Sequence, residues 1–387
     1  MKKSFFYFTA LAFWCTASLS SCIKEAVMTD RAETTQATVK LTLMGSAGTR
    51  ASGTSEPATG NTGESNITSL VVGFFDKDNN KIDIQTKTYS SAPSTETFTL
   101  SLPTTGISNC TAVAVANAPA ATITALSGCA TKAAFLACTV GLSDAQSSLG
   151  LPMSGDVKTS ADASSFTLVN GTVLKVELVR MVARIGLIGI KTNFSAPYTG
   201  ATVKLQRIFL RNAIENTKVT PSTIVSEEMS GTSYLIGGGT WTPGTPGSWN
   251  DGNSYLFNSL AGNEVSISSS SALPDSKYHY FYAFANDASQ SGAKETAFVI
   301  QALFDADGAG TTYNEETVFY PVIIGKSGNG YTTSRTTGLV SRNMIYKIGV
   351  TIKSKGASSP YDNIEDGVIT LTVSVKSWAD APQNVEF

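Results

Sequence analysis

The sequence predicts a mainly β protein with two β-sandwich-like domains, the N-terminal one carrying a helix. Short segments in which apolar and polar residues alternate recur along the chain, as in half-buried strands. Charged residues make up only 15% of the chain, against roughly 25% in typical soluble proteins, while Gly, Ser and Thr are abundant. The length of 387 residues suits two domains of roughly 150 residues or more.

The charge and histidine content argue against several classes of function. With 28 basic and 30 acidic residues and no basic block, the chain lacks the positive surface that nucleic-acid binding requires. The single histidine, His279, excludes two-histidine metal motifs and is the one base available for a Ser-His-acid triad. It lies in the alternating segment KYHYFYAFA and is interpreted as an ordinary strand side chain. We expect no enzymatic activity, no metal and no cofactor.

Residues 1–22 have the pattern of a lipoprotein signal peptide. A positive start at Lys2 and Lys3 precedes an apolar stretch of about 11 residues, which is too short to span a bilayer. The ending Leu-Ser-Ser-Cys is typical of a bacterial lipobox, in which the cysteine is acylated. We therefore expect lipidation at Cys22. Ile23, rather than Asp, follows it, so nothing favours retention at an inner membrane.

Three cysteines remain once Cys15 and Cys22 are assigned to the signal. Cys110, Cys129 and Cys138 are an odd number, which permits at most one disulfide. The last two lie in an Ala-rich segment without a histidine or acidic neighbour. They fit small buried apolar residues, and one disulfide is the alternative.

Residues 23–50 are predicted to be a propeptide that contains one strand. It begins as a tether without periodicity, and from Gln36 to Met44 apolar and polar residues alternate. The apolar face of this strand consists of Ala37, Val39, Leu41 and Leu43. Residues 45–66 are then rich in Gly, Ser, Thr and Ala with a single basic residue, Arg50, which predicts an exposed linker that a protease can reach.

Residues 51–181 are expected to form the N-terminal β-sandwich domain. Its strands are predicted at 67–75, 82–89, 96–102, 110–116, 151–154 and 165–168. Residues 120–142 are the one persuasive helical stretch.

A long apolar run from Val173 to Ile190 predicts a strand about twice the usual length. A strand this long can serve two sheets, so we place the domain junction near Met181. Residues 182–387 then form the C-terminal β-sandwich domain. Its strands are predicted at 201–211, 278–285, 297–304, 317–324, 344–352 and 367–378.

A calcium-like motif follows the first strand of the N-terminal domain. Asp76, Asp78 and Asn80 have the one-three-five spacing of a calcium loop. However, Lys81 stands where Gly is needed and Lys87 where Glu is needed. We expect a hairpin turn there instead of a metal site.

Aromatic residues gather in a loop rich in Gly and Pro. Trp241, Trp249 and Tyr255 could form a platform on which a sugar ring stacks. They fit equally well as loop aromatics packed against the sandwich. The sequence leaves both interpretations open.

The C-terminal segment VITLTVSVKSW has the pattern of the propeptide strand. Its apolar face consists of Ile369, Leu371, Val373 and Val375. Two segments with matched faces can occupy the same slot in a sheet. Alternating strands are common in β proteins, so the match by itself is also compatible with coincidence.

Several motifs occur together in a characteristic order. They are the lipobox at Cys22, the alternating strand before Arg50, TAVAVANAP at 111–119, LPMSG at 151–155, RMVAR at 180–184, FYPV at 319–322, RNMIYKIGVTI at 342–352 and the alternating C-terminal segment. In this combination the chain resembles the FimA-type fimbrillins of Bacteroidales, the type V pilins. The resemblance spans nearly the whole mature chain.

The resemblance implies transthyretin-like domains and a lipoprotein precursor exported to the outer membrane. An Arg-specific surface protease would cut between Arg50 and Ala51 and remove the first strand. A donor strand near 368–378 of a neighbouring pilin subunit would fill the groove, presenting Ile369, Leu371, Val373 and Val375. Repetition would build a surface fimbrium that supports adhesion and biofilm formation, with receptors that the sequence does not identify.

An uncleaved surface lipoprotein is the alternative. It would act as an accessory or tip subunit, or as an adhesin that binds glycan or protein. A full-length chain that persists on cells with its lipid anchor would favour this alternative.

Overall fold

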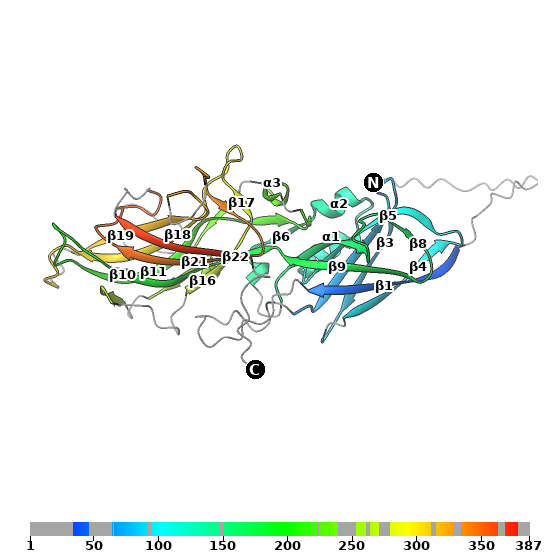
Figure 1. Cartoon of the computed structure of the whole chain (residues 1–387), viewed down its shortest axis with the longest axis horizontal. Helices are drawn as coiled ribbons and strands as arrows, with labels where there is room; N and C mark the ends of the chain where they lie inside the picture. Colours follow the sequence, from blue (N-terminus) through cyan, green and yellow to red (C-terminus); the bar gives the residue numbers. More distant parts are fainter. Residues whose placement is uncertain are drawn as a thin grey trace, which may run out of the picture.

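The mainly β fold class is confirmed by the computed structural model of the chain. It describes residues 34–45, 64, 66–91, 94–146, 150–222, 224–231, 233–238, 253–260, 264–270, 279–310, 315–328, 334–362 and 368–377. The strands form two groups that follow one another along the longest axis, called here the N-terminal half and the C-terminal half (Figure 1). No helix in this described part is long and apolar enough to cross a membrane.

Eight strands of the N-terminal half belong to one sheet. They are β1 (Thr34–Gly45), β2 (Ser69–Phe75), β3 (Lys81–Thr88), β4 (Thr95–Pro103), β5 (Ile107–Ala116), β7 (Met153–Thr159), β8 (Phe166–Leu168) and β9 (Thr172–Arg180). Their order is β3-β2-β5-β7-β9-β1-β4, and β8 pairs with β5.

This sheet is rolled so that its two edge strands approach each other. Gln85 Nε2 on β3 donates to the carbonyl oxygen of Thr99 on β4 at 2.7 Å. The rings of Phe74 and Phe98 meet edge to face, with centroids 5.8 Å apart. Every second residue of a strand points into the roll, and these inward-facing side chains form one apolar interior.

The side chain of Asp76 holds the turn that follows β2. Asp76 Oδ1 accepts hydrogen bonds from the backbone N–H groups of Asp78 and Asn80, at 2.8 and 2.9 Å. Asn79 adopts a positive φ of 64°, which asparagine tolerates in turns. The hairpin expected from the sequence is present between β2 and β3.

The prediction of one continuous helix over 120–142 is wrong. Two short helices, α1 (Ala120–Ser127) and α2 (Lys132–Ala137), occupy the segment, and a short strand, β6 (Thr139–Gly141), follows. Gly128 ends α1, and Thr131 starts a new helix because its hydroxyl accepts from Ala134 N at 3.2 Å. Composition indicated the helical tendency, whereas these caps decide where each helix ends.

The long apolar run is two strands. β9 ends at Arg180, and β10 (Val182–Thr192) begins after Met181. β9 belongs to the eight-stranded sheet, whereas β10 belongs to a sheet of the C-terminal half, so the run does serve two sheets. The domain boundaries drawn from the sequence stay a prediction.

The C-terminal half contains two larger sheets. One has the order β16-β10-β21-β22, and the other has the order β13-β11-β18-β19 with β14 and β15 also paired to β11. The bounds are β11 (Thr202–Ile214), β13 (Tyr234–Ile236), β14 (Phe257–Ser259), β15 (Val265–Ile267), β16 (His279–Phe284), β18 (Ala297–Asp305), β19 (Glu315–Ile323), β21 (Met344–Ile352) and β22 (Ile369–Ser377). Buried residues of both sheets join one apolar core.

Small elements complete the C-terminal half and connect it to the other. They are β12 (Asn216–Lys218), α3 (Val225–Glu228), β17 (Asn286–Asp287) and β20 (Leu339–Val340), with 3-10 turns at Asp144–Gln146 and Ser254–Leu256. β12 pairs with β6, so backbone hydrogen bonds join the two halves.

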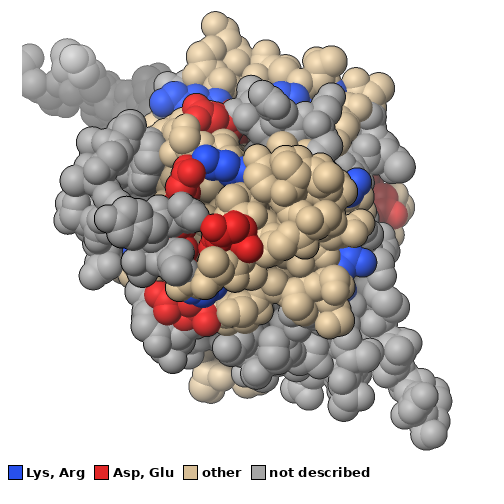
Figure 2. All heavy atoms as spheres, turned by 90° about the vertical axis from the view of Figure 1, so that its left-hand side faces the viewer, with Lys and Arg blue, Asp and Glu red and all other residues tan. Residues whose placement is uncertain are grey.

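Charged groups are dispersed on the face at the end of the C-terminal half. Figure 2 shows blue and red side chains interspersed among uncharged ones there, and the residues drawn in colour form no continuous basic patch.

Candidate functional site: the slot of the first strand

β1 lies inside the rolled sheet, with a paired strand on each side. It runs parallel to β9, with Val39 opposite Thr172, and antiparallel to β4, with Val39 opposite Phe98. In Figure 1 β1 is the blue strand beside β4 and β9. In the described sheet, β9 and β4 are joined only through β1. Removal of β1 would therefore leave a slot between them, with unpaired backbone N–H and C=O groups on both strands.

The face of β1 predicted to be apolar points into the interior. Ala37, Val39 and Leu41 are at most 1% exposed. Leu43 is only half-buried and Met44 is exposed, so full burial ends at Leu41. The three pockets behind these side chains are the part of the slot that a replacement strand has to fill.

The segment predicted as the donor strand forms β22, at the edge of its sheet. Among the described strands it pairs with β21 alone, in an antiparallel register with Val350 opposite Leu371. Ile369, Leu371 and Val373 are half-buried. Val375 is in the strand, opposite Tyr346, but its side chain lies outside the described residues. β1 and β22 thus share an alternating pattern but differ in burial and in the number of paired neighbours.

Several predicted site residues lie outside the described part of the chain. Cys22, Arg50 and Ala51 are among them, so acylation and cleavage stay predictions. The same holds for Trp241 and Trp249.

A carboxylate that the sequence analysis missed anchors the chain near the end of the predicted linker. Glu64 is 8% exposed, and its carboxylate accepts from Arg184 Nη1 at 3.2 Å and from the hydroxyl of Tyr282. Its carbonyl oxygen accepts from Arg180 Nε at 3.4 Å. Burial, with the nearby charge of Glu64, raises the pKa of Tyr282.

Glu64 fixes one end of the segment in which the predicted cut lies. The other end is β1, whose Gly45 is opposite Leu178, close in sequence to Arg180. The available signal was the pair of arginines in one apolar run of the sequence, Arg180 and Arg184, because buried cations need a partner. Nothing local identified Glu64 as that partner.

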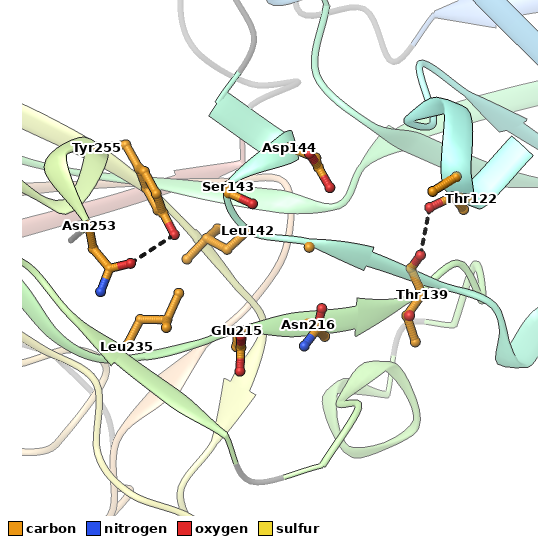
Figure 3. A pocket seen from close by; sticks show the side chains of 12 residues that line it. Thr122, Thr139, Leu142, Ser143, Asp144, Glu215, Asn216, Leu235, Asn253 and Tyr255 are labelled. Atoms are coloured by element: carbon orange, nitrogen blue, oxygen red, sulfur yellow. Dashed lines mark hydrogen bonds between the residues drawn. The ribbon is translucent and has the colours of Figure 1, made fainter.

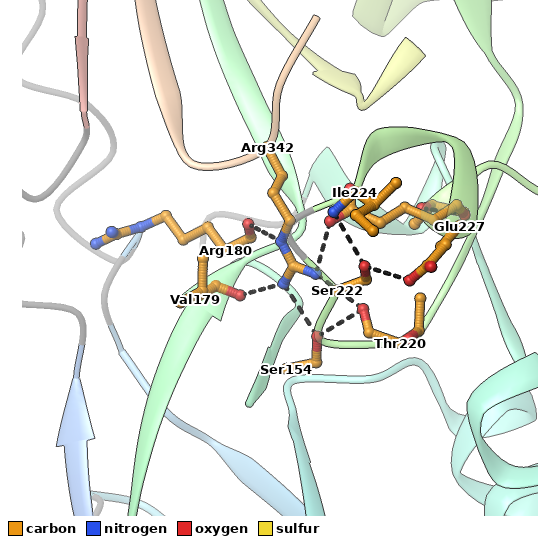
Figure 4. Close-up of polar contacts among 10 residues, drawn as sticks. Ser154, Val179, Arg180, Thr220, Ser222, Ile224, Glu227 and Arg342 are labelled. Carbon is orange, nitrogen blue, oxygen red and sulfur yellow. Dashed lines mark hydrogen bonds and ion pairs between the residues drawn. The ribbon is translucent and has the colours of Figure 1, made fainter. Parts of the chain in front are cut away.

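Arg342 joins the two halves through a set of carbonyl groups (Figure 4). Its guanidinium donates to the carbonyl oxygens of Arg180 at 3.0 Å, Val179 at 2.6 Å and Thr220 at 3.0 Å. It also donates to Ser154 Oγ at 3.0 Å. Val179 and Arg180 end β9, so this residue of the RNMIYKIGVTI motif has a structural role at the junction.

Arg342 also pairs with the buried carboxylate of Glu228. The distance from Nη1 to Oε1 is 3.5 Å, and Glu228 is 2% exposed. Burial raises the pKa of Glu228 to about 7, although Arg342 opposes the rise and Glu227 adds slightly to it. Desolvation therefore exceeds the attraction of a long ion pair.

A polar cleft lies where β6 faces β12 and the loop around Tyr255 (Figure 3). Its volume is about 480 Å³. Asp144, Asn216 and Ser143 place oxygens within 3.7 Å of where a side chain at Gly141 would begin. Tyr255 stands at the other end, and its hydroxyl donates to Asn253 Oδ1 at 3.3 Å.

Comparison with known proteins identifies relatives of this architecture. Residues 37–207 match the family model for the major fimbrial subunit protein (FimA). A comparison with curated proteins gives no match.

Solved structures resemble nearly the whole chain. A fimbrilin (FimA) from Porphyromonas gingivalis W83 superposes with a TM-score of 0.62 at 17% identity, covering 88% of this chain and 97% of that one. A putative cell adhesion protein from Parabacteroides distasonis ATCC 8503 gives 0.57 at 21% identity, covering 89% and 99%. One from Bacteroides eggerthii DSM 20697 gives 0.58 at 20% identity, covering 89% and 96%. At such identities the likeness concerns the fold.

The family match and the shared fold support a pilin or adhesion role. The match to a fimbrial subunit family implies a place in a cell-surface fimbrium and association with other fimbrial subunits. The resemblance noted in the sequence is confirmed: residues 37–207 match the family model of the major fimbrial subunit protein (FimA).

Proposed function

We propose that this chain is a pilin precursor that polymerises when β22 of one copy replaces β1 of the next. Its role is structural and not enzymatic. The observation that carries the proposal is that β1 is paired on both sides and buries Ala37, Val39 and Leu41, whereas β22 has the same alternation but lies at an edge with one neighbour among the described strands.

The difference in burial supplies the driving force. In its own subunit β22 forms one ladder, and Ile369, Leu371 and Val373 are half-buried. In the slot the strand would form two ladders and its apolar side chains would be fully buried. Completing the burial of three aliphatic side chains contributes about 2–5 kcal/mol, taking half of the roughly 1.5–3 kcal/mol for each.

Proteolysis makes the exchange possible. While the chain is intact, β1 is linked covalently to the rest of the subunit and competes with any donor at very high effective concentration. A cut after Arg50 leaves β1 held only by non-covalent contacts, so a neighbouring strand can displace it. Arg31 precedes β1, and a cut there leaves the slot filled.

The cut is tested with an Arg-specific protease acting on purified precursor. We expect a stable fragment that begins at Ala51 and forms SDS-resistant ladders, and we expect Arg50→Ala to remain uncut there and monomeric. N-terminal sequencing identifies the cut. A polymerising fragment that begins at Ala32 and retains β1 contradicts the proposal.

Export as a lipoprotein is tested separately. Cys22→Ala should abolish metabolic labelling of the precursor by palmitate and prevent its delivery to the outer membrane. Undiminished labelling of this variant rules out lipidation at Cys22 but leaves strand exchange to the protease experiment.

Adhesion through the cleft of Figure 3 is a second candidate function. Tyr255 offers a ring for stacking, and Asp144 and Asn216 offer acceptors for hydroxyl groups, a combination suited to a neutral saccharide. Tyr255→Ala should reduce retention of the protein on a glycan array at least tenfold, while polymerisation is unchanged. Equal retention of both proteins excludes the cleft as the glycan site.

A further inference from the structure

Cys129 and Cys138 lie side by side at the ends of α1 and α2. Their Sγ atoms are 3.6 Å apart. Each thiol also points at the carbonyl oxygen four residues earlier, Ala125 O at 3.3 Å for Cys129 and Ala134 O at 3.5 Å for Cys138. The last turns of two neighbouring helices thus bring the thiols together.

We propose that these two thiols are oxidised to a disulfide in the exported protein, which fastens α1 to α2. An S–S bond is about 2.05 Å long, so the sulfur atoms have to approach by roughly 1.5 Å. The inference rests on the proposed export of the chain, because disulfides persist in oxidising compartments.

The third cysteine of the body of the chain provides an internal control. Cys110 is fully buried inside the rolled sheet, and its Sγ donates to the carbonyl oxygen of Ile107 at 3.2 Å. Cys129 belongs to the other apolar core, which also includes Cys138 at its margin. Only one pairing of the three is therefore compatible with the fold.

The oxidant is a molecule that carries a disulfide, such as oxidised glutathione or a dithiol oxidase. Cys138 is more exposed than Cys129, so its thiolate attacks the oxidant and forms a mixed disulfide. The Cys129 thiolate then attacks Cys138 Sγ in the mixed disulfide and displaces the second sulfur of the oxidant. In total, two electrons and two protons pass to the oxidant, which is released as two thiols. Burial and the neighbouring Cys129 raise the pKa of Cys138, so uncatalysed oxidation is slow at neutral pH and faster at higher pH.

The bond would strengthen the connection between the two halves. The carbonyl oxygen of Cys138 accepts from Val219 N at 2.9 Å. The next residue, Thr139, begins β6, which pairs with β12 of the C-terminal half. A disulfide at Cys138 therefore fixes the helix pair to the point where the halves are hydrogen-bonded.

The test uses the reduced full chain exposed to oxidised glutathione and digested with trypsin without reductant. Trypsin cuts after Lys87, Lys132 and Lys158, so the disulfide joins the peptides 88–132 and 133–158. We expect this linked pair in the native chain and in Cys110→Ser, and its loss in Cys129→Ser. Addition of reductant should lower the thermal midpoint by about 5 °C in the native chain and leave Cys129→Ser/Cys138→Ser unchanged.

Three results overturn the proposal. The first is a linked pair that persists in Cys129→Ser, and the second is the absence of a linked pair at any oxidant concentration. The third is protein recovered from the cell surface in which both thiols still react with an alkylating reagent. The fimbrial function is judged independently, because Cys129→Ser/Cys138→Ser should still be cut and form ladders.

Discussion

Arg342 is the residue on which the connection between the two halves depends most. Its side chain is 9% exposed, and its guanidinium donates to four acceptors in addition to the carboxylate of Glu228. Such a group is stabilising only when its hydrogen bonds are complete, because its desolvation is costly. Replacing Arg342 takes a hydrogen-bond donor away from the carbonyl groups at the end of β9.

Arg342→Met should lower the free energy of unfolding by about 3–5 kcal/mol, since it leaves the Glu228 carboxylate buried without its cation. Lys355→Met is the matched control. It removes an exposed pair with Glu316 at 2.5 Å, worth less than about 1 kcal/mol. Denaturant titration of both variants measures the difference, and equal effects would contradict the role given to Arg342.

Glu228 makes the stability of the junction depend on pH. Its pKa of about 7 in the folded chain lies above the ordinary 4.5, so the folded state binds the extra proton. The stabilisation is therefore complete below about pH 4.5 and is lost as pH rises through 7, by at most about 3 kcal/mol.

Glu228→Gln should remove this part of the pH dependence, because the amide is neutral at every pH but can still accept from Arg342. We expect the thermal midpoint of the native chain to fall more between pH 5 and pH 8 than that of the variant. Parallel curves for the two proteins would show that Glu228 does not titrate in this range.

At the scale of elements, the sizes of side chains restrict how β22 can enter the slot. Direct superposition of its apolar face on β1 puts Ile369 into the pocket of Ala37, which overpacks it. If β22 enters in the direction of β1 but shifted by two residues, Ile369 occupies the position of Val39. If β22 enters in the opposite direction, Ile369 occupies the position of Leu43. Both of these alignments place Leu371 in the pocket of Leu41.

Leu371 is accordingly the side chain whose change should be felt most. Replacing Leu371 and Val373 with Asp places charges in apolar pockets, at a cost of several kcal/mol, so the cut subunit should remain monomeric. Thr370→Lys together with Thr372→Lys is the milder control; Thr370 is exposed on the opposite face. SDS-resistant ladders are the readout, and thermal unfolding verifies that each variant folds. Ladders from the Asp variant like those of the native chain contradict entry by this face.

The direction of entry is decided by cross-linking. On β9, Thr172 is opposite Val39 and Val176 is opposite Leu43. A donor with Ile369→Cys should cross-link to an acceptor with Thr172→Cys if it runs in the direction of β1, and to one with Val176→Cys if it runs in reverse. A cross-link to neither position contradicts both alignments.

For the whole molecule, loss of β1 should weaken the N-terminal half far more than the C-terminal half. β1 contributes to the interior of the rolled sheet, whereas the other apolar core, to which both larger sheets of the C-terminal half belong, contains none of its residues. We therefore expect two thermal unfolding transitions in a cut subunit that has lost β1. The midpoint of the transition that belongs to the N-terminal half should be lowered.

A peptide with the sequence 368–378 should restore that midpoint and block ladder formation, because it fills the slot without providing a subunit for the next step. The peptide with Leu371→Asp and Val373→Asp should do neither. Scanning calorimetry and gel analysis of the same samples provide both measurements. Ladder formation that proceeds at excess peptide contradicts the slot as the assembly site.

The sequence by itself determined the features that depend on local pattern. The alternation in residues 36–44 and 369–375 sets which side chains share a face, since successive strand residues point to opposite sides. Local sequence also predicted the turn at Asp76 and the run around Met181 that contributes to two sheets. The roles of Arg50 and Cys22 stay predictions that rest on their surroundings in the sequence.

Only the tertiary structure decided which segments are neighbours. That β1 lies between β9 and β4, that Glu64 is held by Arg184 and that Arg342 reaches the end of β9 are contacts across long stretches of chain. Alternation specifies a face but not a partner strand, and a buried carboxylate has no local signature. These choices are made by the packing of the whole core, which selects the one arrangement that satisfies apolar faces and buried charges together.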